Sequence, residues 1–184
     1  MKKFVLISLL SICGLSVSAQ KVDTIKKRID GSVALSTNDI STNISQIKEL
    51  AHFNELVHTA GLDSLLHAAG PITVFAPDRD AFLHADIPDS LTKPANKAAL
   101  SRILLNHIVM GSLSSKDIKK LIQDNSGSAT LTTLEGGKIT VTINADRNIV
   151  LTDENNKSVI ISRFDIPASN GKIQILNGVL QPGK

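Results

Sequence analysis

The sequence is poor in aromatic residues: it contains no Trp, no Tyr and five Phe, one of which lies near the start of the chain. Proteins that bind single-stranded nucleic acid stack the bases on aromatic side chains beside a basic groove. The scarcity of aromatics therefore argues against nucleic-acid binding, and it removes the usual platforms for stacking sugar rings. A protein interface would also lack the Tyr and Trp anchors of many hot spots, which predicts a modest polar or aliphatic contact.

Cysteine is nearly absent as well, since Cys13 is the only one. It lies in a segment typical of a short bacterial secretory signal peptide, in which Lys2 and Lys3 precede an apolar run that ends at Val17-Ser18-Ala19. Cleavage between Ala19 and Gln20 predicts a secreted or periplasmic protein. The cleaved chain would have no disulfide and no cysteine ligand for a metal. The alternative is a lipoprotein modified at Cys13, although the bulky Ile12 before it is unusual for such signals.

Long apolar runs and an excess of one charge are also missing from the rest of the chain. No later segment approaches the roughly 18 to 20 apolar residues of a membrane-spanning helix. Without Lys2 and Lys3 the chain has 18 basic and 17 acidic residues, so its formal charge falls to +1. The only dense basic run, 26–28, lies between Asp23 and Asp30. This pattern indicates a solvated arm rather than a nucleic-acid patch.

The remaining pattern predicts one domain. Residues 20–39 form a polar N-terminal arm, and residues 40–184 form a continuous patterned region. Its first half is mostly helical: one helix is expected after Asn43, taken as an N-cap, and the next ends at Gly61. From Ala129 the apolar residues alternate, as in Ile139, Val141 and Ile143, which is strand periodicity. Helices first and strands later predict an α+β fold.

A strand-to-helix joint is predicted at residues 73–82, which read TVFAPDRDAF. Thr73 and Phe75 suit a strand, and Pro77 ends it. Asp78 can then cap a helix that contains Phe82 by accepting from its free N–H groups. A second structural signal is Asn170-Gly171, a tight turn between two strands. We expect both motifs to hold the scaffold rather than a ligand.

Three separated motifs resemble a fasciclin-type domain: TVFAPDRDAF, ILLNHIV at residues 103–109, and DIPASNGKIQILNGVLQP at residues 165–182. The resemblance covers about residues 40 to 183. It implies a wedge-shaped β-sandwich with several helices packed beside it. It also implies a secreted or surface-attached module that binds a cell-surface or matrix protein or glycan.

The chain departs from the family pattern at four positions. The family usually has Thr at position 78, Tyr at 106, His at 174 and Asp at 177, whereas this chain has Asp, Asn, Gln and Asn. Animal members of the family have a Tyr-His pair that is invoked for cell binding, and this chain keeps only the His of that pair, His107. It is either a candidate partner contact or an imidazole that hydrogen-bonds a neighbouring loop.

Asp165 and Ile166 match the Asp-Ile dipeptide that animal family members use as an integrin-recognition element. The resemblance makes both residues candidate partner contacts. The alternative is that Ile166 belongs to the core and Asp165 satisfies backbone N–H groups at a strand end.

No motif supports catalysis. His52, Glu55 and His58 form a metal-like spacing, but Glu55 and His58 lie opposite the apolar face of their helix and lack a second liganding half. There is no G-x-S-x-G elbow and no phosphate-binding glycine loop. We therefore expect no enzyme and no cofactor. Two functions remain open: a non-catalytic interaction module, with homo-oligomerisation undecided, or an exported carrier that binds a small apolar or carbohydrate ligand in a cleft.

Overall fold

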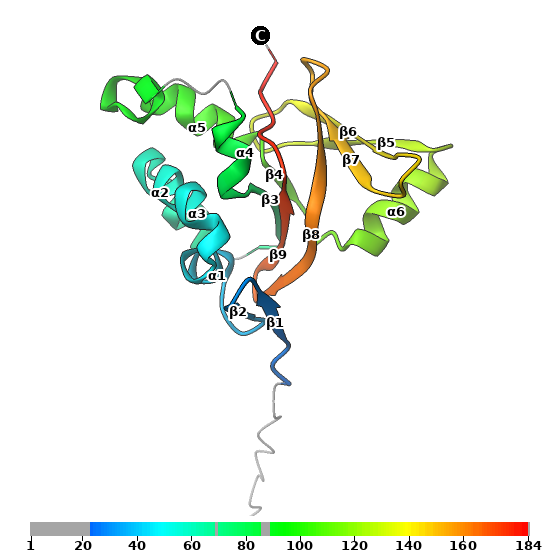
Figure 1. Ribbon diagram of the computed structural model, residues 1–184, viewed down its shortest axis with the longest axis horizontal. Coiled ribbons are helices and arrows are strands. Elements are labelled where there is room, and N and C mark those ends of the chain that lie inside the picture. Colours follow the sequence, from blue (N-terminus) through cyan, green and yellow to red (C-terminus); the bar gives the residue numbers. More distant parts are fainter. Residues whose placement is uncertain (1–22, 69, 86–88, 184) are drawn as a thin grey trace, which may run out of the picture.

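The computed structural model describes residues 23–68, 70–85 and 89–183 (Figure 1). The predicted signal peptide, with its cleavage site at Ala19, and the first residues of the predicted arm lie outside the described residues. Within the described residues, no helix has the length and apolar character needed to cross a membrane.

In the part of the chain that the structure describes, five helices pack together beside the sheet, on the left in Figure 1. They are α1 (Ile40–Gln46), α2 (Ala51–Ala60), α3 (Asp63–His67), α4 (Arg79–Leu83) and α5 (Lys97–Leu105), with short 3-10 turns at Lys48–Leu50, Asp89–Thr92 and Pro94–Asn96. The helix α6 (Ser115–Asp124) lies apart from them, against strands on the other side of the molecule.

A mixed sheet forms the centre of the fold. Its strands are β3 (Ile72–Pro77), β4 (Ile108–Met110), β5 (Ser128–Thr132), β6 (Lys138–Ile143), β7 (Ile149–Thr152), β8 (Ser158–Ala168) and β9 (Gly171–Leu176), in the order β4-β3-β9-β8-β7-β6-β5. Among these described strands, only the β3–β9 pair is parallel. A bridge between Val109 and Thr133 joins the two ends of the sheet. The sheet therefore closes into a near-barrel, and the predicted α+β class is confirmed.

Both faces of β3 and β9 are buried, which explains the strong apolar pattern of these two strands. On β3, Val74 and Ala76 pack into the core beneath α1, α2 and α5. Phe75, which points to the opposite face because side chains alternate along a strand, packs into the barrel core with Ile118 and Ile122 of α6. The sheet thus separates a helical core from a barrel core.

Most of the predicted caps and turns are confirmed. The Asp78 carboxylate accepts from Ala81 N at 2.7 Å and caps α4, immediately after β3 ends at Pro77. Gly61 ends α2 in a left-handed conformation. Asn170 lies in the tight turn between β8 and β9.

The predicted cap at Asn43 is wrong. Asp39 caps α1 by accepting from Thr42 N at 2.7 Å, so the helix begins four residues earlier than expected. Asn43 lies inside this helix and is fully buried. Its amide donates to the carbonyl oxygens of Leu35 and Pro167, at 2.9 and 3.0 Å, and so ties the helix to two strands.

Part of the predicted arm is a β-hairpin, formed by β1 (Lys26–Ile29) and β2 (Ser32–Leu35). Ile29 and Ala34 are buried on its inner face and belong to the helical core. Lys27 Nζ donates to the carbonyl of Phe164 in β8. The hairpin is therefore packed onto the domain.

Candidate functional site

Asp165 lies in an irregular stretch of β8 and has a left-handed backbone, with φ of 56°. Asp tolerates this conformation better than most residues. Its carboxylate accepts two hydrogen bonds of 2.6 Å from Ser115, one from the backbone N–H and one from the hydroxyl. Because Ser115 is the first residue of α6, Asp165 fixes the start of that helix against β8.

Gln174 of β9 completes the network around Asp165. Its side-chain oxygen accepts from Asp165 N at 2.8 Å, and its amide nitrogen donates to the Asp165 carboxylate at 3.0 Å and to Leu113 O at 2.9 Å. Thr73 holds the segment that contains Leu113, since its hydroxyl donates to Gly111 O and accepts from Leu113 N. Side chains from three strands therefore hold the segment between β4 and α6.

The charge of Asp165 is stabilised by these contacts. Partial burial opposes ionisation, but the hydrogen bonds from Ser115 and Gln174 outweigh it, and the pKa of Asp165 lies below its usual value. Lys172 adds a smaller favourable interaction. The carboxylate is thus a charged group that accepts three hydrogen bonds from within the protein.

His107 is fully buried and belongs to a different network. Leu180 N–H donates to its Nε2 at 3.0 Å, which leaves the proton on Nδ1 to be donated to Ile103 O at 2.8 Å. Burial lowers the pKa of His107 to about 4. The neutral imidazole therefore joins the end of α5 to the C-terminal segment.

Ile166 is also fully buried and packs in the helical core. The structure does not bring the three candidate contacts together, because His107 binds the C-terminal segment whereas Asp165 binds the start of α6. Contact with a partner stays a prediction for all three residues. The burial of His107 and Ile166 favours the structural interpretation of these two.

A surface feature at the loop between β4 and α6 was not predicted. A hollow of about 390 Å³ is lined by the Gly70-Pro71 pair, Ser112 and residues 168–171, which include the Asn170-Gly171 turn. Met110 is 65% exposed and ends β4 beside this hollow, where Gly111 N donates to Pro71 O at 2.8 Å. No sequence signal marks this feature, because Met110 continues the apolar pattern of β4.

The metal-like spacing on α2 does not form a ligand set. His52 pairs with Glu55 at 3.5 Å, whereas His58 turns to Asp63 at 3.2 Å. In the described part of the chain, no three His, Cys, Asp or Glu side chains gather closely enough to hold a metal ion.

Known proteins share this fold. A domain pair of the insect cell adhesion molecule Fasciclin I has a TM-score of 0.61 and 18% sequence identity, over 78% of this chain and 50% of that one.

Sequence relatives include a Synechocystis protein, sll1483, which is 35% identical over 129 residues, or 68% of this chain and 63% of that protein. The pig transforming growth factor-beta-induced protein ig-h3 is 30% identical over 147 residues, or 78% of this chain and 20% of that protein. The chain thus spans less than two thirds of either relative. The model of the Fasciclin domain matches residues 48–182. The chain therefore belongs to the fasciclin domain family.

Proposed function

We propose that this protein is a non-catalytic, exported interaction module that binds a cell-surface or matrix protein or glycan. The observation that carries the proposal is the fasciclin domain over residues 48–182, a domain shared with an insect cell adhesion molecule. Export rests on the predicted signal peptide and its cleavage after Ala19.

The alternative is a carrier of a small apolar or carbohydrate ligand, and two hollows among the described residues argue against its apolar form. Carrier pockets are concave and mostly apolar, with a few convergent polar groups. The hollow of about 400 Å³ beside α4 is instead lined by charged side chains: Asp30, Lys48, Glu49, Asp78, Arg79, Asp80 and Arg163. A hollow along α6 is lined by Lys116, Lys119, Lys120 and other polar residues.

We assign the contact surface to the end of the molecule formed by Met110 and the loop between β4 and α6. Met110 supplies an exposed apolar side chain beside the hollow at residues 168–171. Asp165 supports this surface through its hydrogen bonds to Ser115 and, through Gln174, to Leu113. In this arrangement Asp165 positions the loop between β4 and α6, while its own carboxylate oxygens accept hydrogen bonds from within the protein.

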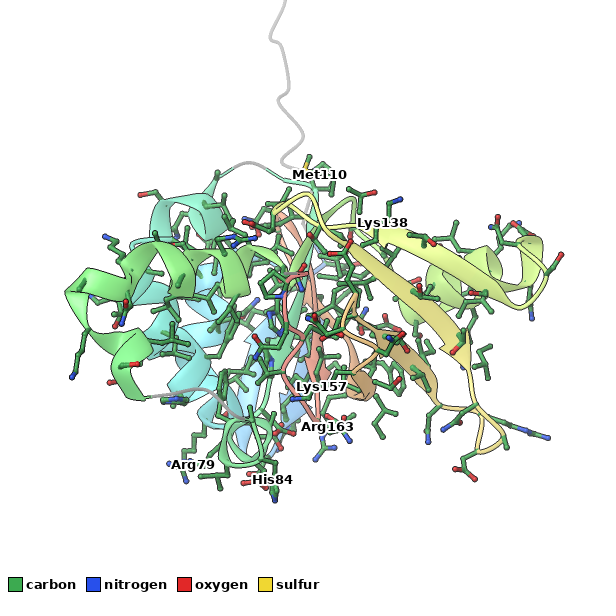
Figure 2. The ribbon with its side chains drawn as sticks, turned by 90° about the horizontal axis from the view of Figure 1, so that it is seen from above. Arg79, His84, Met110, Lys138, Lys157 and Arg163 are labelled. Carbon is green, nitrogen blue, oxygen red and sulfur yellow. The ribbon has the colours of Figure 1, made fainter. Side chains whose placement is uncertain are left out.

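The test is a pull-down from envelope and matrix extracts with immobilised protein. Met110→Glu places a charge on the proposed surface, and we expect it to reduce recovery of the bound partner at least about tenfold. Leu83→Glu is the matched control, because Leu83 is 75% exposed and lies next to His84, across the molecule from Met110 in Figure 2. Equal recovery with both variants would contradict the assigned surface.

A second variant separates the positioning role of residue 165 from its negative charge. Asp165→Asn keeps a residue that tolerates the left-handed backbone but removes the charge. We expect partner recovery to be reduced less than by Met110→Glu. Circular dichroism and thermal unfolding of each variant check that a loss of binding is not a loss of folding.

A further inference from the structure

The outer edge of the β1–β2 hairpin carries unpaired backbone groups. Ser36 N donates to Ile25 O at 2.9 Å, so Ile25 and every second residue after it face β2. Lys26 and Arg28 alternate with these residues. Their backbone N–H and C=O groups therefore point away from β2.

On β2, by contrast, the outward-facing backbone groups of Leu35 are hydrogen-bonded. Leu35 is paired in register with Lys26. Its N–H donates to the side-chain oxygen of Asn43 at 3.0 Å, and its C=O accepts from the side-chain nitrogen of Asn43 at 2.9 Å. Within the described residues, neither a backbone nor a side-chain group bonds to the Lys26 and Arg28 backbone. The outer edge of β1 is thus a free strand edge, which can accept another strand.

This edge is held in a fixed position. Lys27, Ile29 and Ala34 anchor the inner face of the hairpin to β8 and to the helical core. In Figure 1 the hairpin lies below the sheet, with β2 on the side of α1 and β1 on the outer side. A partner strand would meet an edge that is already ordered, which lowers the entropic cost of binding.

We propose that the outer edge of β1 binds an extended acidic segment of a partner protein by strand addition. The inference rests on the proposed function as an interaction module and names the class of partner. Main-chain hydrogen bonds would come from Lys26 and Arg28. Their exposed side chains have no ion pair among the described residues, so acidic side chains at alternate positions of the added strand would pair with them.

Charge argues against a second copy of this chain as the added strand. Antiparallel pairing of two β1 strands about a twofold axis would bring the run Lys26-Lys27-Arg28 opposite itself. Like charges on directly opposed residues destabilise a strand pair. The hairpin also precedes the residues that match the family model, 48–182.

The charge requirement is tested with two labelled peptides, one alternating Glu with Thr and one alternating Lys with Thr. We expect fluorescence anisotropy to detect binding of the Glu peptide and at least about tenfold weaker binding of the Lys peptide. Lys26→Glu with Arg28→Glu should reverse this preference. Lys116→Glu with Lys119→Glu on α6 changes the net charge equally and should leave it unchanged. A preference that survives the β1 charge reversal would overturn the proposal.

The backbone requirement is tested at Lys26. Lys26→Pro removes an N–H that points away from the hairpin, which an edge strand tolerates, whereas Lys26→Ala removes only the side-chain charge. We expect the Pro variant to bind the Glu peptide at least about threefold more weakly than the Ala variant, with unchanged circular dichroism. Equal affinities would overturn strand addition. The pull-down with Met110→Glu is independent of this edge, so failure here leaves the proposed function standing.

Discussion

At the scale of single residues, His107 links stability to pH. Its pKa is about 4 in the folded protein because burial opposes protonation, and it is about 6.5 in the unfolded chain. Between these values the unfolded chain binds more protons, so acidification favours unfolding. We expect the free energy of unfolding to fall as pH decreases from about 6.5 to about 4, by up to about 3 kcal/mol for a shift of this size.

The measurement is urea unfolding at several pH values from 7 to 4.5, on wild type and His107→Gln. The variant lacks the titrating imidazole, so its stability should be lower at pH 7 and should vary less over this range. Asp165 acts in the same direction but at lower pH: its lowered pKa gives stability that is present above about pH 4 and is lost as the pH falls below it. An unchanged pH slope in His107→Gln would contradict the assignment to His107.

At the scale of elements, Gly171 fixes the approach of β9 to β3. Its φ is +154°, and a Cβ atom there would lie 1.8 Å from Ile72 O in the paired strand. Ala cannot fit without separating these strands. We therefore expect Gly171→Ala to destabilise the fold by more than about 3 kcal/mol, which is large for one substitution.

The matched control is Gly136→Ala. Gly136 also has a positive φ, of +98°, but a Cβ atom there meets nothing within 4 Å. Its substitution should cost only the backbone strain of a left-handed residue, about 1 to 2 kcal/mol. Chemical denaturation at pH 7 measures both variants. Similar losses would mean that the contact with Ile72 is not the cause.

The same elements indicate how far the sequence predicts the structure. Local signals worked where one side chain decides the conformation: Asp78 caps α4, and Asn170-Gly171 turns β8 into β9. They failed at Asn43, because its role is to join α1 to Leu35 and Pro167, and no local rule contains a partner 124 positions away.

The hairpin was missed although a signal for it exists. Asp30 and Gly31 both have positive φ, 41° and 77°, as a two-residue Asp-Gly hairpin turn requires. The basic run at residues 26–28 shows no alternation of apolar and polar residues, so it did not indicate a strand. The alternation is present only in the fold, where Lys27 turns inward to β8 while its neighbours stay exposed. The role of Gln174 could not be predicted either, since its partners Asp165 and Leu113 meet only in the folded sheet.

At the scale of the whole molecule, the described chain carries one copy of each proposed contact surface: the Met110 end and the edge of β1. A single copy of a modest, aromatic-poor interface gains no avidity from its own chain. Firm adhesion would then need self-association or a clustered target. We expect the purified protein either to self-associate or to bind its partner one-to-one with a Kd weaker than about 1 μM, which corresponds to a standard binding free energy smaller than about 8 kcal/mol in magnitude.

Sedimentation velocity at several protein concentrations, followed by titration against the partner recovered in the pull-down, distinguishes these cases. If the protein is monomeric, display of many copies on beads should raise the apparent affinity about 10² to 10⁴-fold over the soluble protein, because later contacts form at high effective concentration. Beads that carry Met110→Glu should lose this gain, whereas beads that carry Leu83→Glu should keep it. A monomer that binds one-to-one with nanomolar affinity would contradict the need for clustering, because one such surface would then hold its target without help from neighbouring copies.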